Sequence, residues 1–145
     1  MNREILFRAK SSQSWCYGYV HKDYESPMPN KWRLTTAYGD VKVINSDTIG
    51  EWTGLLDKNN VMIFEGDIVK IERYFNNNFY TEDNYVCKYD TNTVSFKFYY
   101  IVPKDITDVN KYAILGDGAA LSDMGRGFTI EAIGNIWDNP ELIEE

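Results

Sequence analysis

The stretch DKNNVMIFEGDIVKIERYF, residues 57–75, combines turn residues with short apolar runs and indicates the fold of this chain. Asp57–Asn60 is typical of a turn, because Asp caps a turn through its side chain and Asn tolerates the left-handed backbone region. Residues 61–64 predict a short apolar strand, Gly66 predicts a tight corner, and residues 68–75 alternate as a β-strand does. The stretch therefore predicts strands joined by tight turns.

Short alternating segments continue on both sides of this stretch, with no sustained helical periodicity and no internal repeat. They predict hairpins at residues 4–20, 32–45 and 85–102, the second with Gly39 at positive φ, and the third with one face formed by Val94, Phe96, Phe98 and Tyr100. We expect loops at 21–31 and 76–83 and a last strand, 128–138, beside the strand 67–75. The chain is predicted to be all-β, either a small barrel or a sandwich.

Composition places the chain among folded, acidic proteins. Hydrophobic residues make up 43% and aromatic residues 15%, which is enough for a packed core, and the net charge is -7. This charge disfavours nucleic acid as a partner, since phosphate binding needs a basic surface. Cys16 and Cys87 lie far apart within apolar runs, which predicts buried free thiols and a cytoplasmic location. We expect no signal peptide and no membrane span.

Candidate catalytic residues are few. His21 is the single histidine, so neither a zinc site nor a Ser/His/Asp triad finds its usual partners. Glu65 and Asp67 could form an acid/base or metal-binding pair, but Gly66 between them favours a structural corner. The Gly-rich segment 115–127 lacks the spacing of a phosphate-binding loop and is more typical of a mobile or partner-binding loop. We therefore expect no enzyme activity, no cofactor and no metal.

Neighbouring aromatic residues predict a binding surface instead. Consecutive aromatics in a strand point to opposite faces, so each such pair leaves one ring outside the core. Exposed aromatic rings are common at protein interfaces and also stack on single-stranded nucleic acid. The candidate binding surface consists of Phe79, Tyr80, Tyr99, Tyr100, Lys70 and Arg73, chosen from the aromatic set that also includes Tyr74 and Phe75.

Three motifs together resemble the YopX family of phage and prophage proteins. They are REILFRAK (residues 3–10), TIGEWTGLLDKNNVMIFEGDIVK (48–70) and IEAIGNIWDNPELIEE (130–145). Asn60 departs from the family pattern, which usually has Gly in this turn, and residues 76–127 match no motif. The resemblance implies an SH3-like antiparallel β-barrel with an N-terminal β-hairpin extension, which we expect at 46–145 and 1–45. It implies no catalytic residues.

The motif residues are turn, bulge and capping types, so we interpret them as structural. They are Gly50, Gly54, Asp57, Gly66, Asp67, Gly134, Asn135, Asn139 and Pro140, the last of which could open a helical turn. We expect a phage or prophage accessory protein in the bacterial cytoplasm that binds a host or phage protein and could self-associate. A single-stranded nucleic-acid-binding module using Lys31, Arg33, Lys70 and Arg73 is the alternative, and a metal-dependent hydrolase using Glu65 and Asp67 is a weaker one.

Overall fold

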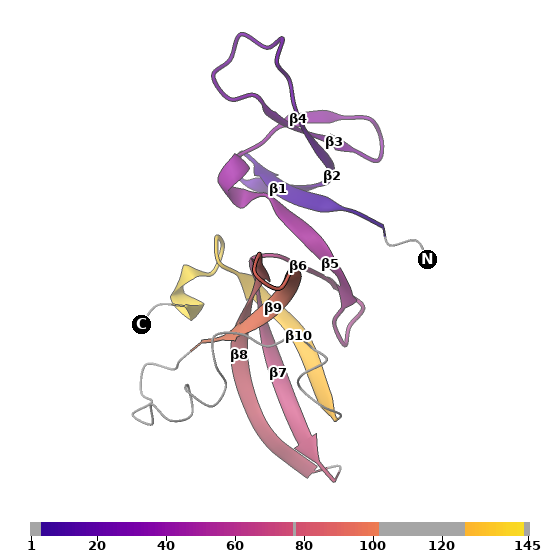
Figure 1. Ribbon diagram of the computed structural model, residues 1–145, viewed down its shortest axis with the longest axis vertical. Helices are drawn as coiled ribbons and strands as arrows, with labels where there is room; N and C mark the ends of the chain where they lie inside the picture. The colour runs from indigo at the N-terminus through magenta and orange to yellow at the C-terminus, as the bar shows by residue number, and fades with distance from the viewer. Residues whose placement is uncertain (1–3, 77, 102–126, 144–145) are drawn as a thin grey trace. The chain divides into compact units, whose positions relative to one another are not determined.

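The computed structural model describes residues 4–76, 78–101 and 127–143 (Figure 1). The chain divides into two compact units, Met1–Gly54 and Leu55–Glu145. The units are defined by compactness, and the predicted boundary after residue 45 stays a prediction. Every regular element among the described residues is a β-strand or a single 3-10 turn, and every strand pairing is antiparallel. The prediction of an all-β antiparallel chain is confirmed.

The first unit is a sheet with the strand order β4-β3-β2-β1-β5. Its core consists of Ala9, Leu34 and Ile44, and Gly18 lies so close to the Thr35 carbonyl that a Cβ atom there would collide with it. A 3-10 turn, Ser46–Thr48, leads into β5, which ends in the second unit. The strands are β1 (Phe7–Ser11), β2 (Ser14–Lys22), β3 (Trp32–Thr36), β4 (Val41–Val43) and β5 (Gly50–Leu56).

The second unit is built on a sheet with the order β10-β7-β8-β9. Its strands are β7 (Asp67–Phe75), β8 (Asn78–Asp90), β9 (Ser95–Tyr100) and β10 (Phe128–Asn135); the short β6 (Met62–Phe64) precedes them, and the 3-10 turn Pro140–Leu142 follows. One face of this sheet carries the core, whose largest members are Tyr85 and Phe98, and Ile63 of β6 belongs to the same cluster. The alternation of β7 explains this placement, since Val69 and Ile71 point into the core while Lys70 and Glu72 point away.

Most predicted strands and turns are confirmed. The hairpins β1–β2, β3–β4 and β8–β9 form, and β10 pairs with β7 in the predicted place. Gly39 has φ +87°, as its turn requires, and Pro140 opens the last 3-10 turn. Within the part of the chain that the structure describes, the strands form open sheets and do not close into a barrel.

Two predictions about the middle of the chain are wrong. Residues 76–83 are mostly not a loop: β8 begins at Asn78, and Thr81 pairs with Arg73 of β7. Polar residues suit this part of β8 because its pairing with β9 begins only at Tyr85, so residues 78–83 form an edge of the sheet where Asn78 and Glu82 are exposed. Val94 is not on the face of Phe98; it lies in the β8–β9 turn with φ +53° and is 73% exposed.

Candidate interaction surface

Asp57 connects the turn that follows β5 to β10. Its Oδ1 accepts hydrogen bonds from the backbone N–H groups of Asn59 (2.8 Å) and Val61 (2.9 Å), and its Oδ2 accepts one from Ala132 (2.9 Å). Burial by itself raises the pKa of this carboxyl group, but the three hydrogen bonds outweigh burial and hold the pKa below its usual value. Asn60 has φ +63°, which explains how Asn replaces the Gly of the family turn. These hydrogen bonds tie the turn to β10 and support the structural interpretation of Asp57.

The Glu-Gly-Asp corner is held by a hydrogen bond and by close packing. Asp67 is buried, and its Oδ2 accepts a hydrogen bond from the Phe64 backbone N–H (2.8 Å), which closes the turn between β6 and β7. Gly66 has φ +92°, and a Cβ atom there would collide with the Trp137 ring. Burial and hydrogen bonding of Asp67 therefore support the structural interpretation of the corner over an acid/base pair with Glu65.

The segment after β10 forms a second structural corner. Asn135 accepts hydrogen bonds through Oδ1 from the backbone N–H groups of Trp137 (3.1 Å) and Asp138 (2.8 Å). The Oδ1 of Asn139 in turn accepts a hydrogen bond from the Asn135 backbone N–H (3.1 Å), and a Cβ atom on Gly134 would collide with this oxygen. The pairing with β7 shifts register between Ala132 and Gly134, so this glycine marks a bulge. The closing motif thus ends β10 and turns the chain.

Two further motif glycines lie in β5. Gly50 is buried and pairs with Arg8 of β1, while Gly54 has φ +87°. The positive φ explains the glycine at Gly54, because other residues rarely adopt this conformation.

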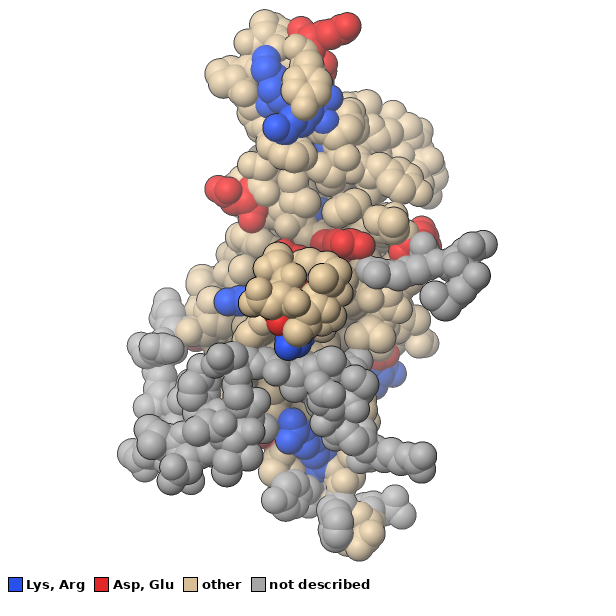
Figure 2. All heavy atoms as spheres, in the orientation of Figure 1, with Lys and Arg blue, Asp and Glu red and all other residues tan. Residues whose placement is uncertain are grey.

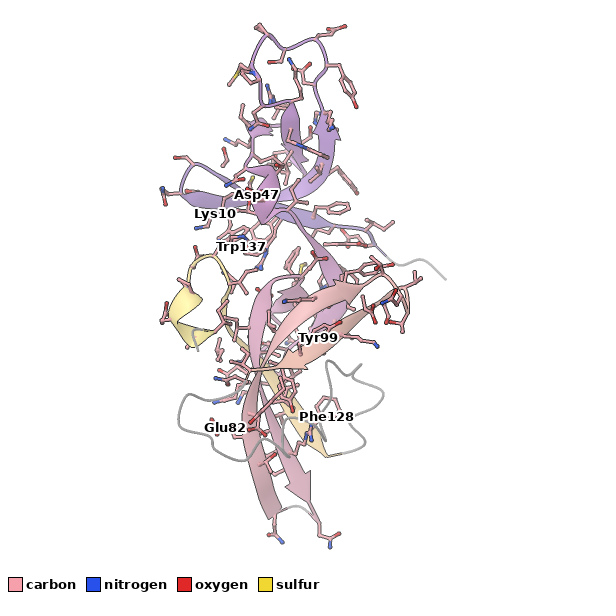
Figure 3. The ribbon with its side chains drawn as sticks, turned by 60° about the vertical axis from the view of Figure 1, so that its left-hand side comes forward. Lys10, Asp47, Glu82, Tyr99, Phe128 and Trp137 are labelled. Atoms are coloured by element: carbon pink, nitrogen blue, oxygen red, sulfur yellow. The ribbon has the colours of Figure 1, made fainter. Side chains whose placement is uncertain are left out.

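Lys70 and Tyr99 of the predicted binding surface lie on the outer face of the four-stranded sheet, opposite the core. Figure 3 labels Tyr99, which belongs to β9. The Lys70 Nζ lies 3.6 Å from both Glu72 Oε1 and Glu131 Oε2. Burial lowers the pKa of Lys70, but the nearby carboxylates, Glu82 among them, outweigh burial and raise it. This lysine is held among acidic side chains, so phosphate groups would meet repulsion there.

Glu72 and Tyr74 form a short hydrogen-bonded pair on this outer face. The Tyr74 hydroxyl donates a hydrogen bond to Glu72 Oε2 (2.6 Å). This hydrogen bond is the main reason why the pKa of Glu72 lies below its usual value and the pKa of Tyr74 above.

Tyr100 and Arg73 lie on the core face instead. Tyr100 is only 7% exposed and packs edge-on against Tyr85 with ring centroids 5.7 Å apart. The Arg73 guanidinium donates a hydrogen bond to the Tyr85 hydroxyl (2.9 Å). Because Lys70 and Arg73 are an odd number of residues apart on one strand, they point to opposite faces. The predicted surface is therefore divided by the sheet and does not form one continuous site.

The remaining predicted site residues are distributed along the chain. Phe79 and Tyr80 belong to β8, but the structure does not describe their side chains. The segment 102–126, which includes most of the candidate loop 115–127, also lies outside the described residues. His21 is exposed, and its Nε2 lies 2.8 Å from Thr35 Oγ1. Cys87 is buried and Cys16 half-buried; both are free thiols, and burial raises the pKa of Cys16.

A second exposed surface lies in the first unit, and the sequence interpretation missed it as a candidate site. Four large side chains on one face of its sheet are well exposed: Tyr17 (47%), Tyr19 (60%), Val41 (59%) and Val43 (41%). The alternation of Trp15–Val20 already predicts that Tyr17 and Tyr19 share a face. Only the pairing with β3 and β4 adds the two valines to it.

The two units also differ in charge, which the net charge conceals. Residues 1–54 contain seven Lys or Arg and six Asp or Glu. Residues 55–145 contain eight Lys or Arg and sixteen Asp or Glu. The formal charge is therefore about neutral in the first unit and strongly negative in the second. Within residues 4–76, 78–101 and 127–143, no three metal-binding side chains gather, and no helix has the length and apolar character needed to span a membrane.

Comparison with known proteins identifies the family. The family model described as YopX protein matches residues 6–144, nearly the whole chain. A solved structure, the crystal structure of protein EF1440 from Enterococcus faecalis, is 23% identical, with 99% of this chain and 100% of that chain covered and a TM-score of 0.46. No curated protein matches the chain. The match over almost the entire length shows that the chain belongs to the YopX family.

Proposed function

We propose that this chain is a non-enzymatic protein-binding module that acts as a phage or prophage accessory protein in the bacterial cytoplasm. The observation that supports a binding role is the exposure of large tyrosine and valine side chains on a regular sheet, with Tyr19 60% exposed. Tyrosine-rich exposed surfaces are typical of protein interfaces, because the ring supplies a large contact area with few rotatable bonds.

The family motifs favour binding over catalysis. Asp57, Asp67 and Asn135 are at most 8% exposed, and each accepts backbone hydrogen bonds that close a turn. Side chains used in this way maintain the fold and are poorly placed to act on a substrate.

The nucleic-acid alternative has weaker support. Its proposed phosphate contacts, Lys70 and Arg73, point to opposite faces of β7. Arg33, a third proposed contact, is 5% exposed and donates hydrogen bonds to the carbonyl of Asn30 (2.8 Å) and the hydroxyl of Ser26 (3.0 Å). Binding to nucleic acid requires several cations that contact the phosphate backbone at the same time. The positions of Lys70, Arg73 and Arg33 do not favour such simultaneous contact.

A pull-down with the tagged full-length chain from a bacterial lysate, read by mass spectrometry, tests the proposal. We expect specific capture of one or a few proteins that survives nuclease treatment. Light scattering on the purified chain separately tests self-association. Capture of nothing, together with a monomer in solution, would count against a binding module. Loss of all captured proteins after nuclease treatment would favour the nucleic-acid alternative.

A further inference from the structure

We infer that the outward face of the first unit's sheet is a docking site for an extended acidic segment of a partner protein. This inference rests on the proposed function and assigns the partner's chemistry and the surface that receives it. We call this surface the tyrosine–valine face and define it by Tyr17, Tyr19, Thr35, Val41 and Val43.

Strand register makes the tyrosine–valine face continuous. Tyr19 of β2 pairs with Thr35 of β3, which pairs with Val41 of β4, so these three side chains form one row across the sheet. The next row contains His21, Arg33 and Val43 in the same order. Paired residues on neighbouring strands have side chains on the same side, with strands roughly 4.8 Å apart. The valines and Tyr19 therefore belong to a single patch.

The exposed face of a sheet that is packed on one side normally carries polar residues. Here the opposite face holds the core residues Ala9 and Leu34, which are fully buried, while Tyr19 and Val41 are about 60% exposed. Exposed β-branched and aromatic neighbours are costly to hydrate, and such patches mark interaction sites. β4 is also the last strand in the order on this side, so an extended segment can lie along it.

The charge of the strands indicates an acidic partner. The strands β1–β4 contain no Asp or Glu, although the chain has 22 of them, and they contain five basic residues: Arg8, Lys10, Lys22, Arg33 and Lys42. Strand alternation and register place Arg8, Lys10 and Arg33 on the face of Tyr19, and Lys22 and Lys42 on the opposite face. Arg8 and Lys10 border the tyrosine–valine face and lie over the Trp15 ring, 4.5 Å and 5.4 Å from its centroid. A partner's carboxylates would meet attraction and no like charge from these strands, which raises both association rate and selectivity.

The same face is better suited to a protein than to nucleic acid. Arg8 and Arg33 are 6% and 5% exposed, so the two arginines contribute charge but cannot follow a phosphate backbone. Lys31 and Arg33 also donate hydrogen bonds to Ser26 of the loop after β2, at the end of the unit where Figure 2 shows basic side chains gathered. Aliphatic side chains such as Val41 and Val43 favour contact with apolar side chains over stacking on bases.

Titration of the isotope-labelled full-length chain with a glutamate–tyrosine copolymer tests this inference. We expect the backbone amide signals of Tyr17, Tyr19, Val41 and Val43 to shift at low salt, and the apparent affinity to fall when salt is raised. Tyr19→Ser should weaken binding about tenfold, as loss of one central interface tyrosine does. Tyr38→Ser is the matched control, because Tyr38 is 94% exposed and lies in the β3–β4 turn.

The inference would be overturned by no binding of the copolymer at low salt, by equal binding of a lysine–tyrosine copolymer, by equal effects of the Tyr19 and Tyr38 variants, or by comparable binding of oligothymidylate at the same amides. A shift of these amides on concentrating the chain alone would also overturn it, since a second copy would then be the occupant. Circular dichroism verifies that both variants fold.

Failure of this inference can be distinguished from failure of the proposed function. If the pull-down still captures its proteins with Tyr19→Ser, the chain is a binding module that uses another surface. If the pull-down captures nothing while the copolymer binds at the tyrosine–valine face, the inference about this surface is supported and the proposed function is contradicted.

Discussion

Replacement of the buried carboxylate of Asp57 should destabilise the second unit. Asp57 is 6% exposed and accepts three backbone hydrogen bonds, two within its own turn and one from Ala132, which is 75 residues away. Hydrogen bonds to a charged group are each worth about 1.5–3 kcal/mol. Water can replace the carboxylate at the exposed Asn59 and Val61, but less well at the half-buried Ala132.

We therefore expect Asp57→Ala to lower the free energy of unfolding by about 2–4 kcal/mol, less than the three hydrogen bonds would give together. Asp57→Asn should cost about half as much, because its remaining oxygen can still accept the two hydrogen bonds of the turn. Urea unfolding at pH 7, followed by circular dichroism, measures both values. Glu141→Ala is the control, since Glu141 is exposed and accepts a long hydrogen bond from the Asn139 side-chain amide (3.5 Å).

The pH dependence of the free energy of unfolding tests the contribution of Asp57 independently. Because the pKa of Asp57 is lowered in the folded state, its contribution is complete above the unfolded-state pKa of about 3.9 and is lost as the pH falls through the folded-state value. Asp57→Ala should remove this part of the acid sensitivity and speed hydrogen exchange at the Ala132 amide. An unfolding free energy within about 1 kcal/mol of the wild type, with unchanged Ala132 exchange, would refute the reasoning.

Two more predictions concern the corner and the outer face of the second unit. Gly66→Ala should destabilise by about 2–4 kcal/mol, because it adds a collision with Trp137 to the strain of positive φ. Gly39 also has a positive φ (+87°), but nothing lies within 4 Å of the added Cβ, so Gly39→Ala should lower the free energy of unfolding by only about 1 kcal/mol. Urea unfolding measures both variants, and equal losses of stability would contradict the collision at Gly66. Tyr74→Phe should raise the pKa of Glu72 towards its ordinary value, since the lost hydroxyl is the main cause of its depression. Carboxyl NMR titration measures this shift, and an unchanged pKa would contradict the assignment.

Local features of the chain were predictable from sequence where one residue's chemistry decides its conformation. Gly39 and Gly66 were expected in turns, and both have positive φ. The alternation in β7 predicts which of its residues share a face, and the pairing with β10 agrees. β8 was harder to predict, because the polar residues after Asn78 look like a loop and become a strand only through pairing with β7.

The candidate site was less predictable than the fold. Tyr99 and Tyr100 were expected to leave one ring outside the core, but the pattern could not say which one. Packing of the sheet buries Tyr100 against Tyr85 and leaves Tyr99 half-buried on the other face. The role of the β4 valines was equally hidden in the sequence, because Val41 and Val43 come onto the face of Tyr19 only through the pairing of β3 with β2 and β4.

The sequence by itself determined the all-β class, the turns and the family of this protein, because these follow from alternation, from backbone preferences and from motifs that are local in the chain. The tertiary structure alone decided which residues act together. Asp57 reaches Ala132, and Tyr19 joins Val41, only when strands from distant segments pair. Alternation assigns side chains to two faces, but the packing of the sheet decides which face becomes the core and which one remains exposed to a partner.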